Sequence, residues 1–140
     1  MSRRDVPADE EPTVHREYVL DVRILEVHPP DFEEPRYRFE APDHVGTSFE
    51  SPGTAELYAD VYFDVNGFEE AGTGDRGIPP EIIQGGRDTM AAYMLTQPYA
   101  DPHYVASFYG KKPSQVQRYV GSVKKRAREV REGAADLGLD

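Results

Sequence analysis

Residues 101–121, DPHYVASFYGKKPSQVQRYVG, decide how the second half of this 140-residue chain folds. Asp101 can cap the start of a helix, and Pro102 suits the first helical position, where no amide donor is needed. Val105 and Tyr109 lie four residues apart and predict the buried face of this helix. Gly110 can adopt the left-handed conformation that ends a helix. The stretch therefore predicts two helices joined by a tight turn at Gly110.

The second helix is expected to begin near Pro113 or Ser114, and Ser114 and Gln117 have the spacing of a capping box. Ala106 is small enough for this second helix to pass close over the first. Apolar residues then recur at helical spacing and predict a buried stripe, with Tyr119 beside it. The stripe consists of Val116, Val120, Val123, Ala127 and Val130.

Charge is distributed unevenly along the chain, which has 26 acidic and 16 basic residues and a formal net charge of −10. Residues 1–109 hold 8 basic and 22 acidic side chains, net −14, whereas residues 110–140 hold 8 basic and 4 acidic side chains, net +4. The acid-rich, lysine-poor composition resembles that of halophilic proteins. The whole chain would repel a polyanion, but binding depends on the local field at the face in contact.

The absence of cysteine excludes disulfides and thiolate metal sites. No stretch is apolar enough to span a bilayer, and the N-terminal residues lack the apolar centre of a signal peptide. We therefore expect a soluble, cytoplasmic protein that does not bind a membrane.

The alternation of apolar and polar side chains over residues 14–66 predicts an antiparallel β region. Residues 16–28, REYVLDVRILEVH, predict one long strand, and residues 35–41, PRYRFEA, predict a second. Residues 54–65, TAELYADVYFDV, predict a third strand and have the cleanest period of two in the chain. A short fourth strand is expected near residues 47–50. One face of this sheet should be buried and the other exposed to water.

The remaining segments complete an α+β organisation. Residues 1–13 predict a disordered tail, residues 67–79 a connection rich in glycine and proline, residues 80–133 a helical region and residues 134–140 a second tail. The connection has glycines at positions 72, 74 and 77, but it lacks the lysine of a phosphate-binding loop, which favours a flexible linker. The pattern is helical from Pro80 onward, although the two glycines at 85 and 86 weaken the first turns.

The spacing of Ala106, Gly110 and Val116 resembles the 20-residue pattern of the helix-turn-helix superfamily. The match covers residues 102–121, and Lys111 stands where the family usually has an apolar residue. With a preceding helix, residues 80–133 resemble the three-helix form found in region 4 of bacterial sigma factors and in many small regulators. The resemblance implies that the second helix of the pair enters the major groove of DNA.

The resemblance also implies roles by position. The residues that would read bases are Ser114, Gln115, Gln117 and Arg118, since glutamine can pair with adenine and arginine with guanine. The residues that would bind phosphates are Lys111, Lys112, Lys124, Lys125, Arg126 and Arg128. His103 and Tyr104 are further candidates for backbone contacts.

These observations favour a sequence-specific protein that binds double-stranded DNA, a small transcriptional regulator without a catalytic, cofactor or metal site. Binding at two half-sites favours a homodimer, with the β region as the interface to test first. A protein-interaction module that uses the helix-turn-helix as a scaffold is the alternative, because a basic helix face is often only a solvated surface. An enzyme stands well behind both, since the four histidines are scattered and show no recognised ligand spacing.

Overall fold

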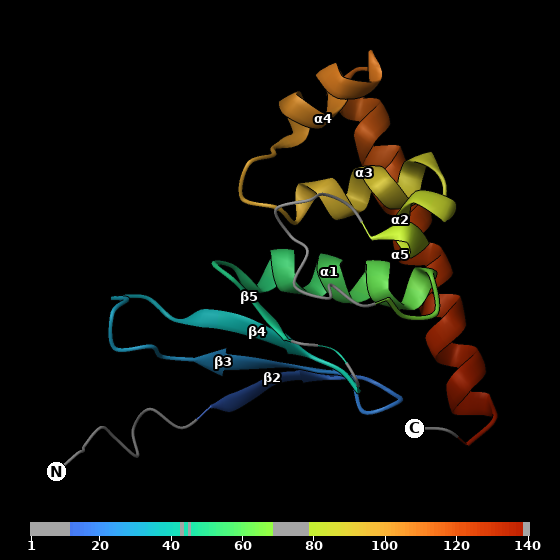
Figure 1. The fold of residues 1–140 in the computed structure, drawn as a ribbon. Helices are drawn as coiled ribbons and strands as arrows, with labels where there is room; N and C mark the ends of the chain where they lie inside the picture. Colours follow the sequence, from blue (N-terminus) through green and yellow to red (C-terminus); the bar gives the residue numbers. More distant parts are fainter. Residues whose placement is uncertain (1–11, 43, 45, 69–78, 139–140) are drawn as a thin grey trace, which may run out of the picture.

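The computed structural model describes residues 12–42, 44, 46–68 and 79–138. Its N-terminal part is a four-stranded antiparallel sheet, and five helices follow, which confirms the predicted α+β class. Helix α1 (Pro52–Asp64) lies over one face of the sheet. Helix α5 (Pro113–Asp136) runs the height of the molecule, with α4 (Pro102–Tyr109) near its first turns (Figure 1).

The strands follow one another in the sheet in the order of the chain, β2-β3-β4-β5. Ile24 of β3 pairs with Phe39 of β4, and both side chains are buried beneath the helices. The strands β4 and β5 confirm the second and fourth predicted strands. The strand bounds are β2 Thr13–Glu17, β3 Arg23–Val27, β4 Arg36–Glu40 and β5 Thr47–Phe49.

A hairpin replaces the single strand that was predicted for residues 16–28. The chain reverses between Val19 and Val22, where Leu20 and Asp21 have φ angles of 62° and 60°. The Tyr18 amide donates to the Val22 carbonyl at 2.8 Å. Two consecutive left-handed residues form the type I′ turn that matches the twist of a hairpin, and this turn usually contains Asn-Gly. The prediction was wrong because the sequence Leu-Asp carries no such turn signal.

Helix α1 replaces the third predicted strand, so the interpretation of residues 54–65 was wrong. Ser51 caps the helix, since its hydroxyl accepts a hydrogen bond from the Thr54 amide at 3.1 Å, and Pro52 occupies the first turn. This start signal lies just before the alternating stretch and outweighs it. The buried apolar side chains also fit a helical period, and they are Ala55, Tyr58, Ala59, Val61 and Phe63.

The helices after residue 79 follow the prediction with three changes. Two glycines divide the first helical stretch into α2 (Pro80–Gln84) and α3 (Arg87–Leu95), because Gly86 adopts a φ of 102°. The last helix extends to Asp136, so the predicted tail of residues 134–140 is helical at its start. The third change is the N-cap of α5, which is Lys112. Residues 1–11 and 69–78, within the predicted tail and connection, lie outside the described residues.

One hydrophobic core joins the sheet to the helices. It contains Ile24 and Phe39 from the sheet, Tyr58 from α1, Tyr93 from α3 and Val123 from α5. The two predicted regions therefore share their buried side chains. A second, smaller cluster lies among α3, α4 and α5 and holds the turn between α4 and α5 in place.

Candidate nucleic-acid interface

Helix α4 begins and ends as its sequence predicts. The Asp101 carboxylate accepts a hydrogen bond from the Tyr104 amide at 2.8 Å, which caps the first turn. Gly110 ends the helix with φ 64° and ψ 37°, in the left-handed region. The Lys111 amide then donates to the Ala106 carbonyl at 2.8 Å, as in a Schellman motif. These bonds fix the direction in which the chain leaves α4.

Helix α5 is capped two residues earlier than predicted. Lys112 is the N-cap residue, and its amide donates to the side-chain oxygen of Gln115 at 3.0 Å. The prediction of a capping box between Ser114 and Gln117 was therefore wrong, because Pro113 already occupies the first turn of the helix. Gln115 uses its carbonyl oxygen in this cap, which leaves its amide group as the available donor.

The three helices around the turn pack on small and aliphatic side chains. Val105 and Ala106 of α4 are buried, and Val116 of α5 is fully buried against them. Ala91 and Met94 of α3 complete this cluster. The positions that carry the resemblance to helix-turn-helix proteins, namely a small residue, a left-handed glycine and a buried aliphatic residue, thus share one local core and its turn.

The buried stripe of α5 leaves the opposite face of the helix to solvent. Four of its five predicted members are buried, and Val130 is half-buried. The exposed face carries three of the four predicted base-reading residues, and Gln115 is half-buried. The exposed residues of this face, with the turn before it, include Lys111, Lys112, Ser114, Gln117, Arg118, Lys124, Lys125 and Arg128.

Arg126 departs from the predicted set because its guanidinium, although partly exposed, binds carboxylates of the protein itself. Its Nε donates to Asp64 at 2.6 Å and its Nη1 donates to Asp88 at 2.9 Å. Thr89 donates to the same Asp64 carboxylate at 2.7 Å. The Asp64 side chain is only 2 % exposed. Arg126 therefore joins α1, α3 and α5, and the carboxylates raise the pKa of its guanidinium.

A second arginine of α5, Arg131, binds α1 in the same way. Its Nη1 donates to Asp60 at 2.8 Å, and its guanidinium lies over the Phe63 ring. Burial raises the pKa of Asp60, while the charges of Arg131 and Lys124 partly offset this effect. Lys124 lies seven residues before Arg131, on the same side of α5, and is exposed.

Sequence reasoning missed these ion pairs because it placed α1 in a strand. On a helix, Glu56, Asp60 and Asp64 recur every four residues and form one acidic stripe. Arg126 and Arg131 meet two members of this stripe. The third, Glu56, pairs with His15 at 2.9 Å and Arg16 at 3.6 Å. The four-residue spacing of the carboxylates was a signal that could have predicted the helix.

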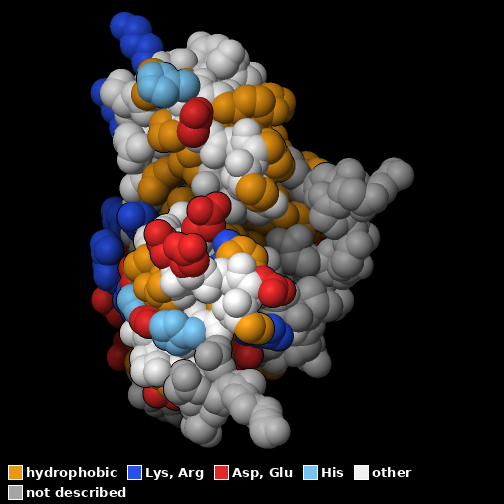
Figure 2. Space-filling view, turned by 90° about the vertical axis from the view of Figure 1, so that its left-hand side faces the viewer, with side chains coloured by type: hydrophobic (Ala, Val, Ile, Leu, Met, Phe, Trp, Pro, Cys, Tyr) orange, Lys and Arg blue, Asp and Glu red, His pale blue; other side chains and the backbone are white. Residues whose placement is uncertain are grey.

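The aromatic residues of α4 divide between the surface and the local core. Tyr104 and Phe108 are 47 % and 57 % exposed, and Tyr99, 57 % exposed, contacts Tyr104 with ring centroids 5.8 Å apart. Figure 2 shows hydrophobic side chains gathered over the upper part of one face, at the height of α4 in Figure 1. Tyr109, by contrast, packs against Tyr119 at 6.2 Å beside the local core.

Within the described residues, no helix is long and apolar enough to cross a membrane. In the same part of the chain, no three histidine, aspartate or glutamate side chains converge as metal ligands. Comparison with known proteins found no family model, no curated protein sequence and no solved structure that matches this chain.

Proposed function

We propose that this protein binds double-stranded DNA through the exposed face of the first half of α5 and acts as a small transcriptional regulator. The observation that carries the proposal is a local surplus of positive charge. No acidic residue occurs between Lys111 and Arg128, in a chain whose net charge is −10. Six of the seven cations in this interval are exposed. A local field of this kind attracts a polyanion despite the overall charge.

The geometry of the helix supports the same proposal. Arg118 and Lys125 are seven residues apart, so both project from the face opposite the buried stripe. The exposed stretch from Ser114 to Arg128 is about 21 Å long at 1.5 Å per residue. An α-helix of this kind fits the major groove of B-DNA.

Gly121 is a third supporting feature, because the fold gives no reason for it. It lies inside α5, is exposed, and a Cβ placed there would meet no described atom within 4 Å. Glycine within a helix costs about 0.5–1 kcal/mol relative to alanine. A bare backbone between Gln117 and Lys124 allows the close approach of a second surface.

The test begins with selection of the preferred duplex from random or genomic DNA by the purified full-length protein. Arg118→Ala should then cost about 1–3 kcal/mol on that duplex and relax the preference at one base pair. Lys125→Ala should weaken all duplexes alike and lower the salt slope by about one. Equal losses on the selected and random duplexes for both variants would show a non-specific contact, and unchanged binding in both would exclude this face.

An interaction module is the second candidate, and the exposed aromatic residues favour it. Tyr99, Tyr104 and Phe108 place three large rings on the surface around α4. Exposed clusters of this kind are common at protein interfaces. The double variant Tyr104→Ser and Phe108→Ser separates the two candidates, because duplex affinity should remain within about twofold of the parent if the basic face of α5 carries the function.

A further inference from the structure

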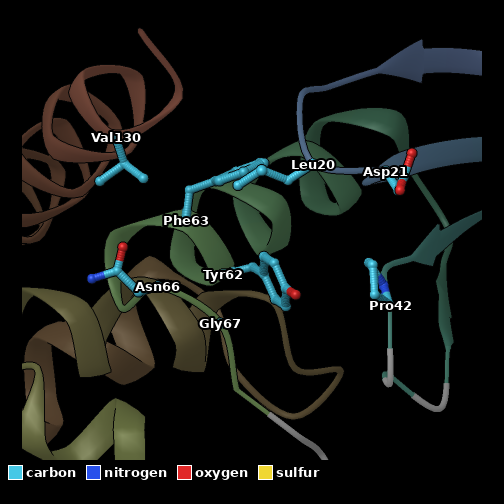
Figure 3. Close-up of a pocket in the computed structure, with 8 residues that line it drawn as sticks. All are labelled: Leu20, Asp21, Pro42, Tyr62, Phe63, Asn66, Gly67 and Val130. Atoms are coloured by element: carbon cyan, nitrogen blue, oxygen red, sulfur yellow. The ribbon is translucent and has the colours of Figure 1, made fainter. Parts of the chain in front are cut away.

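A cavity of about 410 Å³ lies on the opposite side of the molecule from the α4–α5 turn, between the β2–β3 turn and the end of α1. Leu20 and Asp21 line it from the turn, and Tyr62, Phe63 and Asn66 line it from the end of α1. Figure 3 shows Leu20, Tyr62 and Pro42 around its open centre, with Val130 of α5 beyond Asn66.

The backbone around this cavity is unusual. Within the described residues, three non-glycine residues have positive φ angles, and they are Leu20, Asp21 and Asn66. All three line the same cavity. Asn66 has an ordinary reason, since it ends α1 in a Schellman motif with the Gly67 amide donating to the Tyr62 carbonyl at 2.7 Å. Leu20 and Asp21 have positive φ angles because they form the hairpin turn, but leucine is disfavoured in the left-handed region, and this leucine keeps its side chain 39 % exposed at the cavity.

Two aromatic rings form a rigid corner of the cavity. The rings of Tyr62 and Phe63 have centroids 5.8 Å apart and planes at 89°. Phe39 packs against Tyr62 at 5.3 Å, and a Cβ on Gly67 would lie 3.4 Å from the Tyr62 hydroxyl oxygen. Packing against Phe39 and Phe63 restricts the orientation of the Tyr62 ring, so this corner of the cavity is formed before a ligand arrives.

The charge of the lining residues indicates what kind of ligand would fit. Asp21 is the one charged residue among the described residues that line the cavity. The nearest arginine of α5, Arg131, is engaged by Asp60 and lies over the Phe63 ring. A second hollow of about 330 Å³ adjoins the cavity at Asp21 and Pro42. Its other charged lining residues are Glu17, Glu40 and Arg23, and Arg23 pairs with Glu40 at 3.1 Å.

We propose that this cavity binds a small organic cation, an ammonium group carried on a compact apolar body. Asp21 supplies the opposite charge, the Tyr62 ring supplies a cation–π contact, and Leu20 and Val130 contact the apolar body. This binding site is independent of the DNA contact proposed for α5.

The test is a titration of the ¹⁵N-labelled full chain with choline, followed by amide chemical shifts. The control ligand is 3,3-dimethylbutan-1-ol, which has the same shape without the charge. Choline should shift the resonances of residues 19–22 and 65–67 and bind at least about fivefold more tightly than the neutral alcohol. Equal affinity of the two ligands, or the absence of saturable shifts at these residues, would overturn the proposal.

Three variants locate the charge and the ring. Asp21→Asn should weaken choline binding about fivefold and leave the alcohol unchanged, because asparagine tolerates the left-handed turn position. Asp31→Asn changes the net charge equally in a different loop and should retain the parent affinity. Tyr62→Phe keeps the ring and should bind within about twofold, so a complete loss of choline binding in this variant would contradict a cation–π contact. An Asp21→Asn variant that binds choline as the parent does would also overturn the proposal.

Discussion

The two halves of α5, residues 113–125 and 126–136, contain the same kinds of cation but use them differently. In the first half, Arg118 and Lys125 project into solvent. In the second half, Arg126 and Arg131 bind carboxylates of α1 and α3. Acidic residues are absent between Lys111 and Arg128 but return with Glu129 and Glu132. The first half therefore presents charge, whereas the second half attaches the helix to the rest of the fold, with Arg128 as an exposed exception.

A cation of α5 is therefore available for a ligand only where the fold supplies no carboxylate to bind it. Arg126 and Arg128 are two residues apart in the sequence and were predicted to serve the same role. Arg126 faces the acidic stripe of α1, whereas Arg128 lies on the exposed side of the helix. The side of the helix on which an arginine lies thus decides whether it binds a carboxylate of the fold or remains available for phosphate.

The largest effect should come from breaking the contacts of the second half. Arg126→Ala leaves the Asp64 carboxylate buried without its cation, and removal of one partner of a buried pair costs about 3–5 kcal/mol. Because the Arg126 side chain is 41 % exposed, we expect about 3 kcal/mol of lost unfolding free energy in urea denaturation. Arg128→Ala is the matched control and should change stability by less than about 0.5 kcal/mol. Equal effects in the two variants would contradict the distinction between an arginine that binds α1 and α3 and one on the exposed side of α5.

Tyr18 gives an effect of intermediate size, which depends on pH. Arg131 lies over its ring, and burial, the main cause, raises the pKa of its phenol from 10.0 to about 12. The folded protein keeps this proton between these pH values while the unfolded chain releases it. The unfolding free energy should therefore be intact below pH 10 and fall as the pH rises towards 12, by at most about 1.4 kcal/mol per unit.

Tyr18→Phe should reduce this alkaline loss, which denaturation curves at several pH values would measure. A smaller loss should remain, because burial also raises the pKa of the Tyr99 and Tyr109 phenols. The Tyr18 hydroxyl has no hydrogen-bond partner among the described residues, so its removal should not lower stability at neutral pH. Tyr104→Phe, which removes an exposed phenol, should keep the pH dependence of the parent. If the unfolding free energy of Tyr18→Phe falls with pH as steeply as that of the parent, the Tyr18 phenol is not the group responsible.

The smallest effect on stability should come from the two exposed glycines of α5. Gly121→Ala and Gly133→Ala should each stabilise the protein by about 0.5–1 kcal/mol, because neither added methyl group meets a described atom within 4 Å. Their effects on duplex affinity should differ. Gly121→Ala should weaken binding, whereas Gly133→Ala, which lies beside Glu132 and Asp136, should not. Equal duplex affinities for the two variants would contradict a close approach of DNA to α5 at Gly121.

Local signals in the sequence predicted the α4–α5 pair well. Asp101, Pro102 and Gly110 act within a few residues of their own positions, so their meaning does not depend on the rest of the fold. Residues 54–65 failed because a period of two and a period of 3.6 both fit a stretch in which nearly every second residue is apolar. The cap at Ser51 decided between them, and it lies outside the alternating stretch.

The role of Arg126 could not be predicted because its partners are distant in the sequence. Asp64 and Asp88 are 62 and 38 residues away, and they come together only once α1 is known to be a helix. The cavity beside Leu20 depends in the same way on a turn that has no Asn-Gly signal. Exposed positions of α5 could be predicted, since its buried stripe fixes them.

The most direct test is a titration of the ¹⁵N-labelled full-length protein with its selected duplex, in which amide shifts are compared along α5. We expect the amide shifts to be largest at Lys111, Lys112 and the exposed residues from Ser114 to Arg128. They should be small from Glu129 to Asp136. Binding should weaken linearly in log–log plots against salt, with a slope that counts the phosphates contacted. No binding of any selected duplex, or shifts centred on the sheet or on the second half of α5, would contradict the proposed function.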